Sequence, residues 1–118
     1  YFSCLNIGVD EILHSGKQRA RQTAEIIALH SERSERVSEI DGLAPNDDPA
    51  LWYRRLLERK DNVMLVGHLP HLKRLASLLL FHNEQTEFFC FEPGEIICLE
   101  RGDRDKWSLR WMIPPEIV

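Results

Sequence analysis

The sequence has 118 residues, of which 43% are hydrophobic and 29% are charged, and its formal net charge is −4 at pH 7. No apolar run approaches the ~20 residues that a membrane-spanning helix requires, and an acidic chain is not typical of a nucleic-acid binder, which usually has a basic face. We expect one domain over residues 1–118, because a chain of this length builds one modest hydrophobic core.

The chain first predicts a strand followed by a helix. Residues 9–14 read as a short strand with Ile12 and Leu13 at its centre. Ser15 and Gln18 have the spacing of a capping box, in which Ser15 is the N-cap and Gln18 the third helical residue. Small and apolar residues then recur at helical spacing, so we expect a helix to about Leu29.

A second strand and helix are expected after a charged loop. Residues 37–40 are a possible short edge strand. Asp48 and Pro49 have the pattern of an N-cap and a first helical residue, because proline loses no hydrogen bond at that position. The inner face of the helix that follows would be formed by Trp52, Tyr53, Leu56 and Leu57.

The apolar run at residues 63–66 predicts a strand buried on both faces, as in parallel sheets. Gly67 ends this strand, and a helix is expected from Pro70 to about Phe81. His68 would therefore lie at the carboxyl end of the strand, where open α/β sheets bind their ligands. The buried stripe of the helix would be Leu72, Leu75, Ala76, Leu79 and Leu80.

The last third of the chain is rich in strand patterns. Residues 88–91 and 96–100 read as strands separated by a Pro-Gly turn, and a hairpin loop begins at residues 101–103. Trp107, Leu109 and Trp111 alternate with polar residues, which predicts one buried face in the last strand. Strand–helix alternation followed by this β-rich tail indicates an α/β fold with a mixed sheet.

The two helices that follow the expected strands at residues 9–14 and 63–66 both begin with cations. Cations are disfavoured there, because they lie beside the positive end of the helix dipole. If those strands are parallel, both basic helix starts lie at one sheet edge. Helix N–H groups and cations would then form a phosphate pocket, with Arg19, His68 and the backbone of Leu69 converging on one anion. The alternative is that the cations are solvated or paired with acids. The residues concerned are Lys17, Arg19 and Arg21 in the first helix, and His68, His71, Lys73 and Arg74 in the second.

Other kinds of site are not indicated. The histidines lack metal-ligand spacing, so no metal is expected. Cys4, Cys90 and Cys98 form no close pair, which favours a reducing cytoplasm. There is neither a Gly-x-Ser-x-Gly elbow nor a Gly-rich nucleotide loop. Taken singly, His68 could be a structural residue at a strand end, and Arg19 could form a surface salt bridge of little energetic value.

Four segments carry a family resemblance that spans nearly the whole chain. They are HSGKQRARQTAE (14–25), GLAPNDDP (42–49), VGHLPHLKRLASLLL (66–80) and WSLRWMIPP (107–115). Together they resemble the SixA-type phosphohistidine phosphatases, small members of the histidine phosphatase superfamily that also holds the phosphoglycerate mutases. The family pattern Ser-x-x-x-Arg-Ala-x-x-Thr falls on Ser15, Arg19, Ala20 and Thr23. Arg19 then matches the arginine that clamps the phosphate, and His68 the second active-site histidine.

The resemblance implies a phosphoglycerate mutase-like, three-layer α/β/α sandwich with a mixed, mostly parallel sheet. It also implies a cytoplasmic hydrolase that needs no cofactor and removes the phosphoryl group from phosphohistidine on a signalling phosphotransfer protein. The family nucleophile is the histidine of an Arg-His-Gly motif, which this sequence does not contain. We therefore expect that the nucleophile strand precedes Tyr1, and that the chain alone is weakly active and monomeric unless it exchanges strands.

Two alternatives remain open. One is a small-molecule phosphomonoesterase of the same superfamily, although the chain has no long insertion that could cap a small substrate. The other is a catalytically inactive module that binds phosphate, sulfate or a phosphoprotein.

Overall fold

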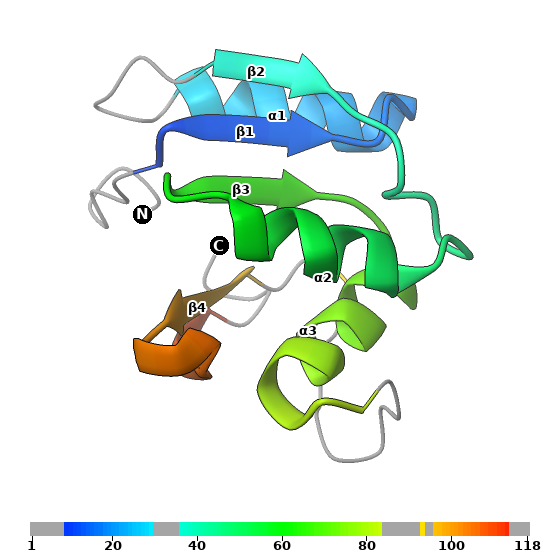
Figure 1. Ribbon diagram of the computed structural model, residues 1–118. Helices are drawn as coiled ribbons and strands as arrows, with labels where there is room; N and C mark the ends of the chain where they lie inside the picture. Colours follow the sequence, from blue (N-terminus) through cyan, green and yellow to red (C-terminus); the bar gives the residue numbers. More distant parts are fainter. Residues whose placement is uncertain (1–8, 30–35, 84–92, 94–95, 114–118) are drawn as a thin grey trace.

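A computed structural model of the chain describes residues 9–29, 36–83, 93 and 96–113. Strands and helices alternate in this part of the chain, and a hairpin follows them (Figure 1). The elements are β1 (Glu11–His14), α1 (Gln18–Leu29), β2 (Arg36–Glu39), α2 (Pro49–Glu58), β3 (Val63–Val66), α3 (His71–Phe81), β4 (Ile96–Arg101), the 3₁₀ turn η2 (Asp103–Asp105) and β5 (Trp107–Ile113).

The main sheet is parallel, and β1 is its central strand, with β2 on one side and β3 on the other. Helix α1 lies on one face of this sheet, and α2 and α3 lie on the other side (Figure 1). The pleat of β1 divides the core accordingly, because successive side chains point to opposite faces. Leu13 packs with Trp52, Leu56 and Leu75, in a cluster that includes residues of α2 and α3.

The α/β fold class and the parallel arrangement are confirmed. The edge position expected for the second strand is also confirmed among the described strands, although β2 runs from Arg36 to Glu39 rather than over residues 37–40. The strands β4 and β5 form a separate antiparallel sheet in the described part of the chain.

The expectation that residues 63–66 are buried on both faces is wrong. All four residues of β3 are half-buried. The reason lies in the topology, since β3 is the last strand of the three-stranded sheet formed by the described residues. An end strand has a hydrogen-bonded neighbour on one side only within its sheet, so the apolar run that is typical of an interior strand lies here at an edge.

Polar contacts hold the amino ends of β1 and β3 together. Arg59 is paired with Glu11 at 2.7 Å and with Asp61 at 2.7 Å, and its hydrogen bonds to Asp61 lower the pKa of that carboxyl group. The backbone N–H of Asn62 donates to Asp10 Oδ2, while the N–H of Asp10 donates to the carbonyl of Asn62. These bonds lie at the sheet edge opposite the predicted site and fix the alignment of the two strands.

Arg101 attaches the hairpin to the rest of the molecule. Its guanidinium donates to the carbonyls of Leu56, Leu57 and Arg59, at the end of α2. The last carbonyls of a helix lack a full set of intrahelical partners, although that of Leu56 also accepts the N–H of Arg59. They lie at the negative end of the helix dipole, so a cation there is favourable. The same guanidinium lies 5.9 Å from the ring centroid of Trp107.

The inward face expected for the last strand is only partly correct. Trp107 is half-buried, but Leu109 is 42% exposed. A bulge also interrupts the strand beyond Leu109, because the register pairs Cys98 with Trp111 and then Leu99 with Leu109. An extra residue on one strand reverses the faces on its two sides, so the regular alternation expected over residues 107–111 does not hold. The expected strand at residues 88–91, together with Cys4 and Cys90, lies outside the described residues.

A search of the described residues for a helix long and apolar enough to cross a bilayer finds none.

Candidate functional site

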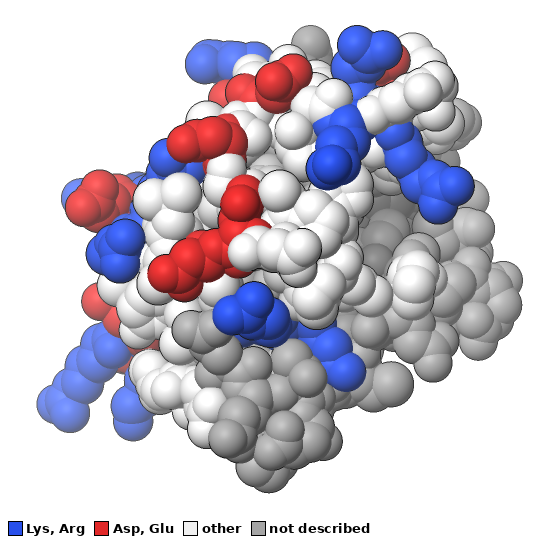
Figure 2. Space-filling view, turned by 90° about the vertical axis from the view of Figure 1, so that its right-hand side faces the viewer, with Lys and Arg blue, Asp and Glu red and all other residues white. Residues whose placement is uncertain are grey.

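The loops after β1 and β3 leave the sheet next to each other. The two strands are parallel and in register, with His14 opposite Val66. The two strands that precede the basic helix starts therefore end at the same edge of the sheet, as predicted. Figure 2 looks onto this edge, because the strands in Figure 1 point toward the side that Figure 2 presents. Lys and Arg side chains gather at its upper right, and Asp and Glu side chains gather toward its left (Figure 2).

The loop after β1 turns at Gly16, whose φ of +87° is a conformation that residues with a side chain rarely adopt. The N–H of Gly16 donates to Nδ1 of the buried His14 at 3.1 Å. Because α1 begins only at Gln18, the prediction that Ser15 is its N-cap is wrong. The left-handed turn at Gly16 separates Ser15 from the helix, and its hydroxyl is directed across the sheet edge instead.

The loop after β3 is held by its own backbone. The carbonyl of His68 accepts the N–H of Leu72 at 3.0 Å, which begins the hydrogen bonding of α3. Pro70 is the N-cap residue rather than the first helical residue, and it has αR dihedral angles. A Cβ atom on Gly67 would lie 3.2 Å from the carbonyl oxygen of Leu43, so the end of β3 passes close to the neighbouring loop.

A hydrogen bond joins the two loops. Ser15 Oγ lies 2.7 Å from Nε2 of His68, although the residues are 53 positions apart in the sequence. His68 is half-buried, and burial together with the charge of Lys17 lowers its pKa from 6.5. In the unliganded protein His68 is therefore largely neutral near pH 7. A dianion beside the ring would reverse this effect, because a nearby negative charge favours the protonated imidazole.

Arg19 is the second residue of α1, and its side chain is exposed. None of the described residues pairs with its guanidinium, so it is available to a ligand. Leu69 is half-buried and follows His68 directly. Convergence of Arg19, His68 and the Leu69 backbone on one anion remains a prediction, although Arg19 and His68 belong to adjacent loop–helix segments.

His71 lies outside this basic group, contrary to its expected place among the cations. It is fully buried, and neither ring nitrogen has a hydrogen-bond partner in the described structure. Burial is the main cause that lowers its pKa, so it is neutral at pH 7 and adds no charge to the site. Among the described residues no group of three or more His, Cys, Asp or Glu side chains could hold a metal ion.

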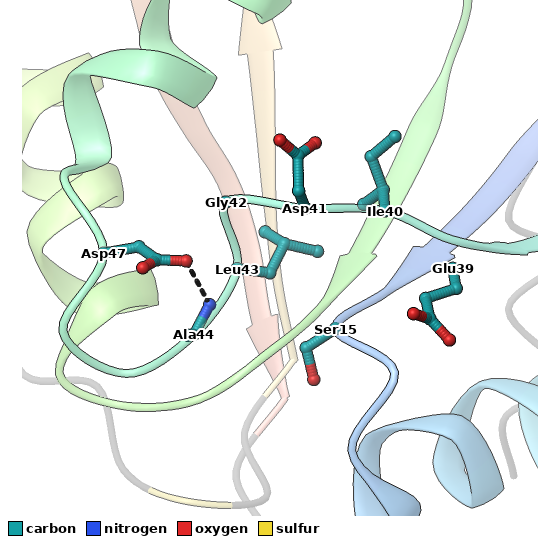
Figure 3. A pocket seen from close by; sticks show the side chains of 8 residues that line it. All are labelled: Ser15, Glu39, Ile40, Asp41, Gly42, Leu43, Ala44 and Asp47. Carbon is teal, nitrogen blue, oxygen red and sulfur yellow. Dashed lines mark hydrogen bonds between the residues drawn. The ribbon is translucent and has the colours of Figure 1, made fainter.

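A pocket of about 470 Å³ adjoins Ser15, and sequence reasoning did not predict it. Its other walls come from the end of β2 and the loop between β2 and α2, and Figure 3 shows how these residues lie. The Ser15 hydroxyl and the Glu39 carboxylate point to the same side, whereas the Asp41 carboxylate points away (Figure 3). The lining residues are Ser15, Glu39, Ile40, Asp41, Gly42, Leu43, Ala44 and Asp47.

The far wall of the pocket is held in place by α2. The indole N–H of Trp52 and the guanidinium of Arg55 both donate to the carbonyl of Asp41 at 3.1 Å. The carboxylate of Asp47 accepts the N–H of Ala44 at 2.9 Å (Figure 3). Asp48 caps α2 as predicted, by accepting the N–H of Ala50. The signal that could have indicated this pocket was the position of residues 42–49 shortly after a strand, at the same edge as Ser15.

Comparisons with known proteins concern the fold. No protein-family model and no curated protein matches the sequence. A solved structure described as that of the protein histidine phosphatase SixA complexed with tungstate has a TM-score of 0.78 and 20% sequence identity. The match covers 97% of this chain and 74% of the other. The chain therefore has a SixA-type histidine phosphatase fold, and the predicted phosphoglycerate mutase-like architecture is confirmed.

Proposed function

We propose that this chain provides the phosphate-holding part of a phosphohistidine phosphatase. The substrate would be a phosphorylated histidine on a signalling phosphotransfer protein. The observation that carries the proposal is the hydrogen bond between Ser15 and His68, because it brings two phosphatase-like segments together at the carboxyl edge of the sheet. The SixA-type fold supports the same function.

In the proposed mechanism the chain stabilises charge on the transferred phosphoryl group. Arg19 would donate to its equatorial oxygens, where negative charge concentrates in the transition state. His68 would be the second donor, and it would become positively charged by taking up a proton when the dianion binds. The attacking group would be a histidine of an Arg-His-Gly segment, as the resemblance implies. Its ring nitrogen forms a bond to phosphorus while the bond to the substrate histidine breaks, and water then hydrolyses the enzyme phosphohistidine.

The experiment measures release of phosphate from a phosphohistidine peptide by residues 1–118, with and without an added peptide that carries an Arg-His-Gly strand. We expect little release by the chain alone and faster release with the peptide. His68→Ala and Arg19→Ala should each abolish the gain. No release under either condition contradicts the proposed enzyme function. Full activity of the chain alone, lost in His68→Ala, would instead assign the nucleophile to His68.

A catalytically inactive binding module is the second candidate. It is favoured by the absence of an Arg-His-Gly sequence from residues 1–118. This module would bind a phosphorylated peptide with an affinity that depends on Arg19, but would not hydrolyse it under either condition. Tungstate, the ligand named for the SixA structure, is a suitable anion with which to measure such binding.

A further inference from the structure

The hydroxyl of Ser15 is placed between a fixed loop and the ring of His68. The N–H of Gly16 bonded to the buried His14 holds the loop on one side, and the hydrogen bond to His68 Nε2 lies on the other. Ser15 also lines the pocket beside the site, and both Ser15 and His68 are only half-buried. The backbone of His68 is held separately by the N–H of Leu72.

The hydrogen-bond partners of Ser15 favour one direction for its proton. A serine hydroxyl donates one proton and accepts through two lone pairs. The N–H of Lys17 donates to Ser15 Oγ at 3.4 Å, which engages one lone pair. The other lone pair could accept an N–H of His68, but the O–H would then have no partner among the described residues. When the O–H instead donates to Nε2 of His68, 2.7 Å away, both groups are paired. A ring nitrogen accepts only when it carries no proton, and a neutral imidazole in this arrangement must carry its proton on Nδ1.

We infer that Ser15 is a positioning residue that holds the His68 proton on Nδ1 and thereby selects the ring nitrogen that donates to an anion in the site. The hydrogen bond also restrains the rotation of the ring, because the backbone of His68 is fixed independently. Lys17, whose charge acts on His68, favours the neutral ring that this arrangement requires. The catalytic consequence of the inference rests on the proposed function, but the protonation pattern does not.

The decisive measurement is the ¹⁵N chemical shift of both ring nitrogens of His68, recorded on residues 1–118 near neutral pH. We expect the Nδ1–H form to predominate in the wild type and in Ser15→Thr, which keeps a hydroxyl. In Ser15→Ala the two neutral forms should become mixed. Ser108→Ala, a change to an exposed residue on β5, is the matched control and should leave the spectrum of His68 unchanged. Amide spectra would establish that each variant is folded.

Activity provides a second readout once the Arg-His-Gly peptide is added. Ser15→Ala should lower kcat on the order of tenfold or more, as is common when a residue that orients a functional histidine is removed. KM should change much less, and Ser15→Thr should restore most of the rate.

The two proposals can fail separately. The proposed function fails if the wild type releases no phosphate with the added peptide. The inference stands even then if His68 carries its proton on Nδ1 in the wild type and in Ser15→Thr but not consistently in Ser15→Ala. If His68 has its proton on Nε2, or if the ring shifts are the same in Ser15→Ala as in the wild type, the inference is overturned whatever the activity.

Discussion

The Cα atoms of His14 and Val66 are paired across the parallel strands β1 and β3, and this pairing brings Ser15 to His68. Ser15 and His68 each lie within two positions of the end of a strand. The register of the two strands therefore determines the distance between the starts of their loops. Parallel strands that end level present their loops and helix starts at one edge. The contact is therefore a consequence of the sheet, which Arg59 and Glu11 fix at the opposite edge.

Arg19→Ala should lower phosphohistidine hydrolysis in the assay with added Arg-His-Gly peptide by on the order of a hundredfold or more. This is the scale of losing one donor to the transition state. Arg19→Lys should be a poor replacement, because an ammonium cannot hold two oxygens through a planar fork. Arg21→Ala is the control, since Arg21 is on the same helix and lies 3.8 Å from Glu25. An unchanged rate for Arg19→Ala would remove Arg19 from the mechanism.

Binding of sulfate should become tighter as the pH falls below 6.5, the value from which burial and Lys17 lower the pKa of His68. The dianion favours protonated His68, so binding takes up a proton, and such binding is promoted by acid. Sulfate is suitable because it stays doubly charged over this range. Calorimetric titrations at several pH values would test this, and His68→Gln should reduce the pH dependence. A wild-type affinity that is constant or falls with acidification contradicts the role of His68 as an anion donor.

The buried His71 should make the protein less stable in mild acid. Burial lowers its pKa in the folded state from the usual 6.5, whereas the unfolded chain protonates it normally. Below 6.5 the unfolded state therefore binds more protons, so the free energy of unfolding decreases as the pH decreases. The contribution of one histidine to this slope is at most about 1.4 kcal/mol per pH unit.

Urea unfolding of the wild type and of His71→Leu at neutral and mildly acidic pH would measure this contribution. His71→Leu should lose less stability on acidification, because it has no group to protonate. His68 acts in the same direction, so some pH dependence should persist. His82→Asn is the control, because His82 is exposed, and asparagine tolerates its left-handed backbone with φ of 57°. Equal slopes for the wild type and His71→Leu would exclude His71 as the source.

Arg101→Ala should lower the free energy of unfolding by about 1–3 kcal/mol. The substitution removes the guanidinium that donates hydrogen bonds to the carbonyls of Leu56, Leu57 and Arg59. Arg101→Lys should recover only part of this loss, because one ammonium does not match the spread of three acceptors. The loss should appear in urea unfolding curves.

Arg110→Ala is the matched control on the same hairpin. Arg110 lies 3.4 Å from Glu100, and both side chains are 58% exposed, so this pair should contribute little. If Arg101→Ala and Arg110→Ala have the same small effect, the attachment of the hairpin to α2 does not depend on Arg101.

Much of the local structure could be predicted from the sequence because it depends on short-range chemistry. Asp48 and Pro49 begin α2 as expected, since the cap bond to Ala50 and the fixed φ of proline act within one turn. The apolar stripe of α3 was likewise readable from its spacing, and Leu75, Ala76 and Leu79 are buried. The position of His68 after a strand and before a helix followed from the apolar run and from Gly67.

Only the tertiary structure decided what these residues contact. The spacing of Ser15 and Gln18 fits a helix cap, yet a sheet neighbour far along the chain provides the partner of Ser15. His71 was predicted to be one of the cations at the start of α3. Packing buries its side chain, and burial lowers its pKa and keeps it neutral. Gly42 lines the pocket, and the bonds from Trp52 and Arg55 hold the carbonyl of its neighbour Asp41. Local patterns determine where elements begin and end, but register and packing between distant segments determine which side chains meet and which remain charged.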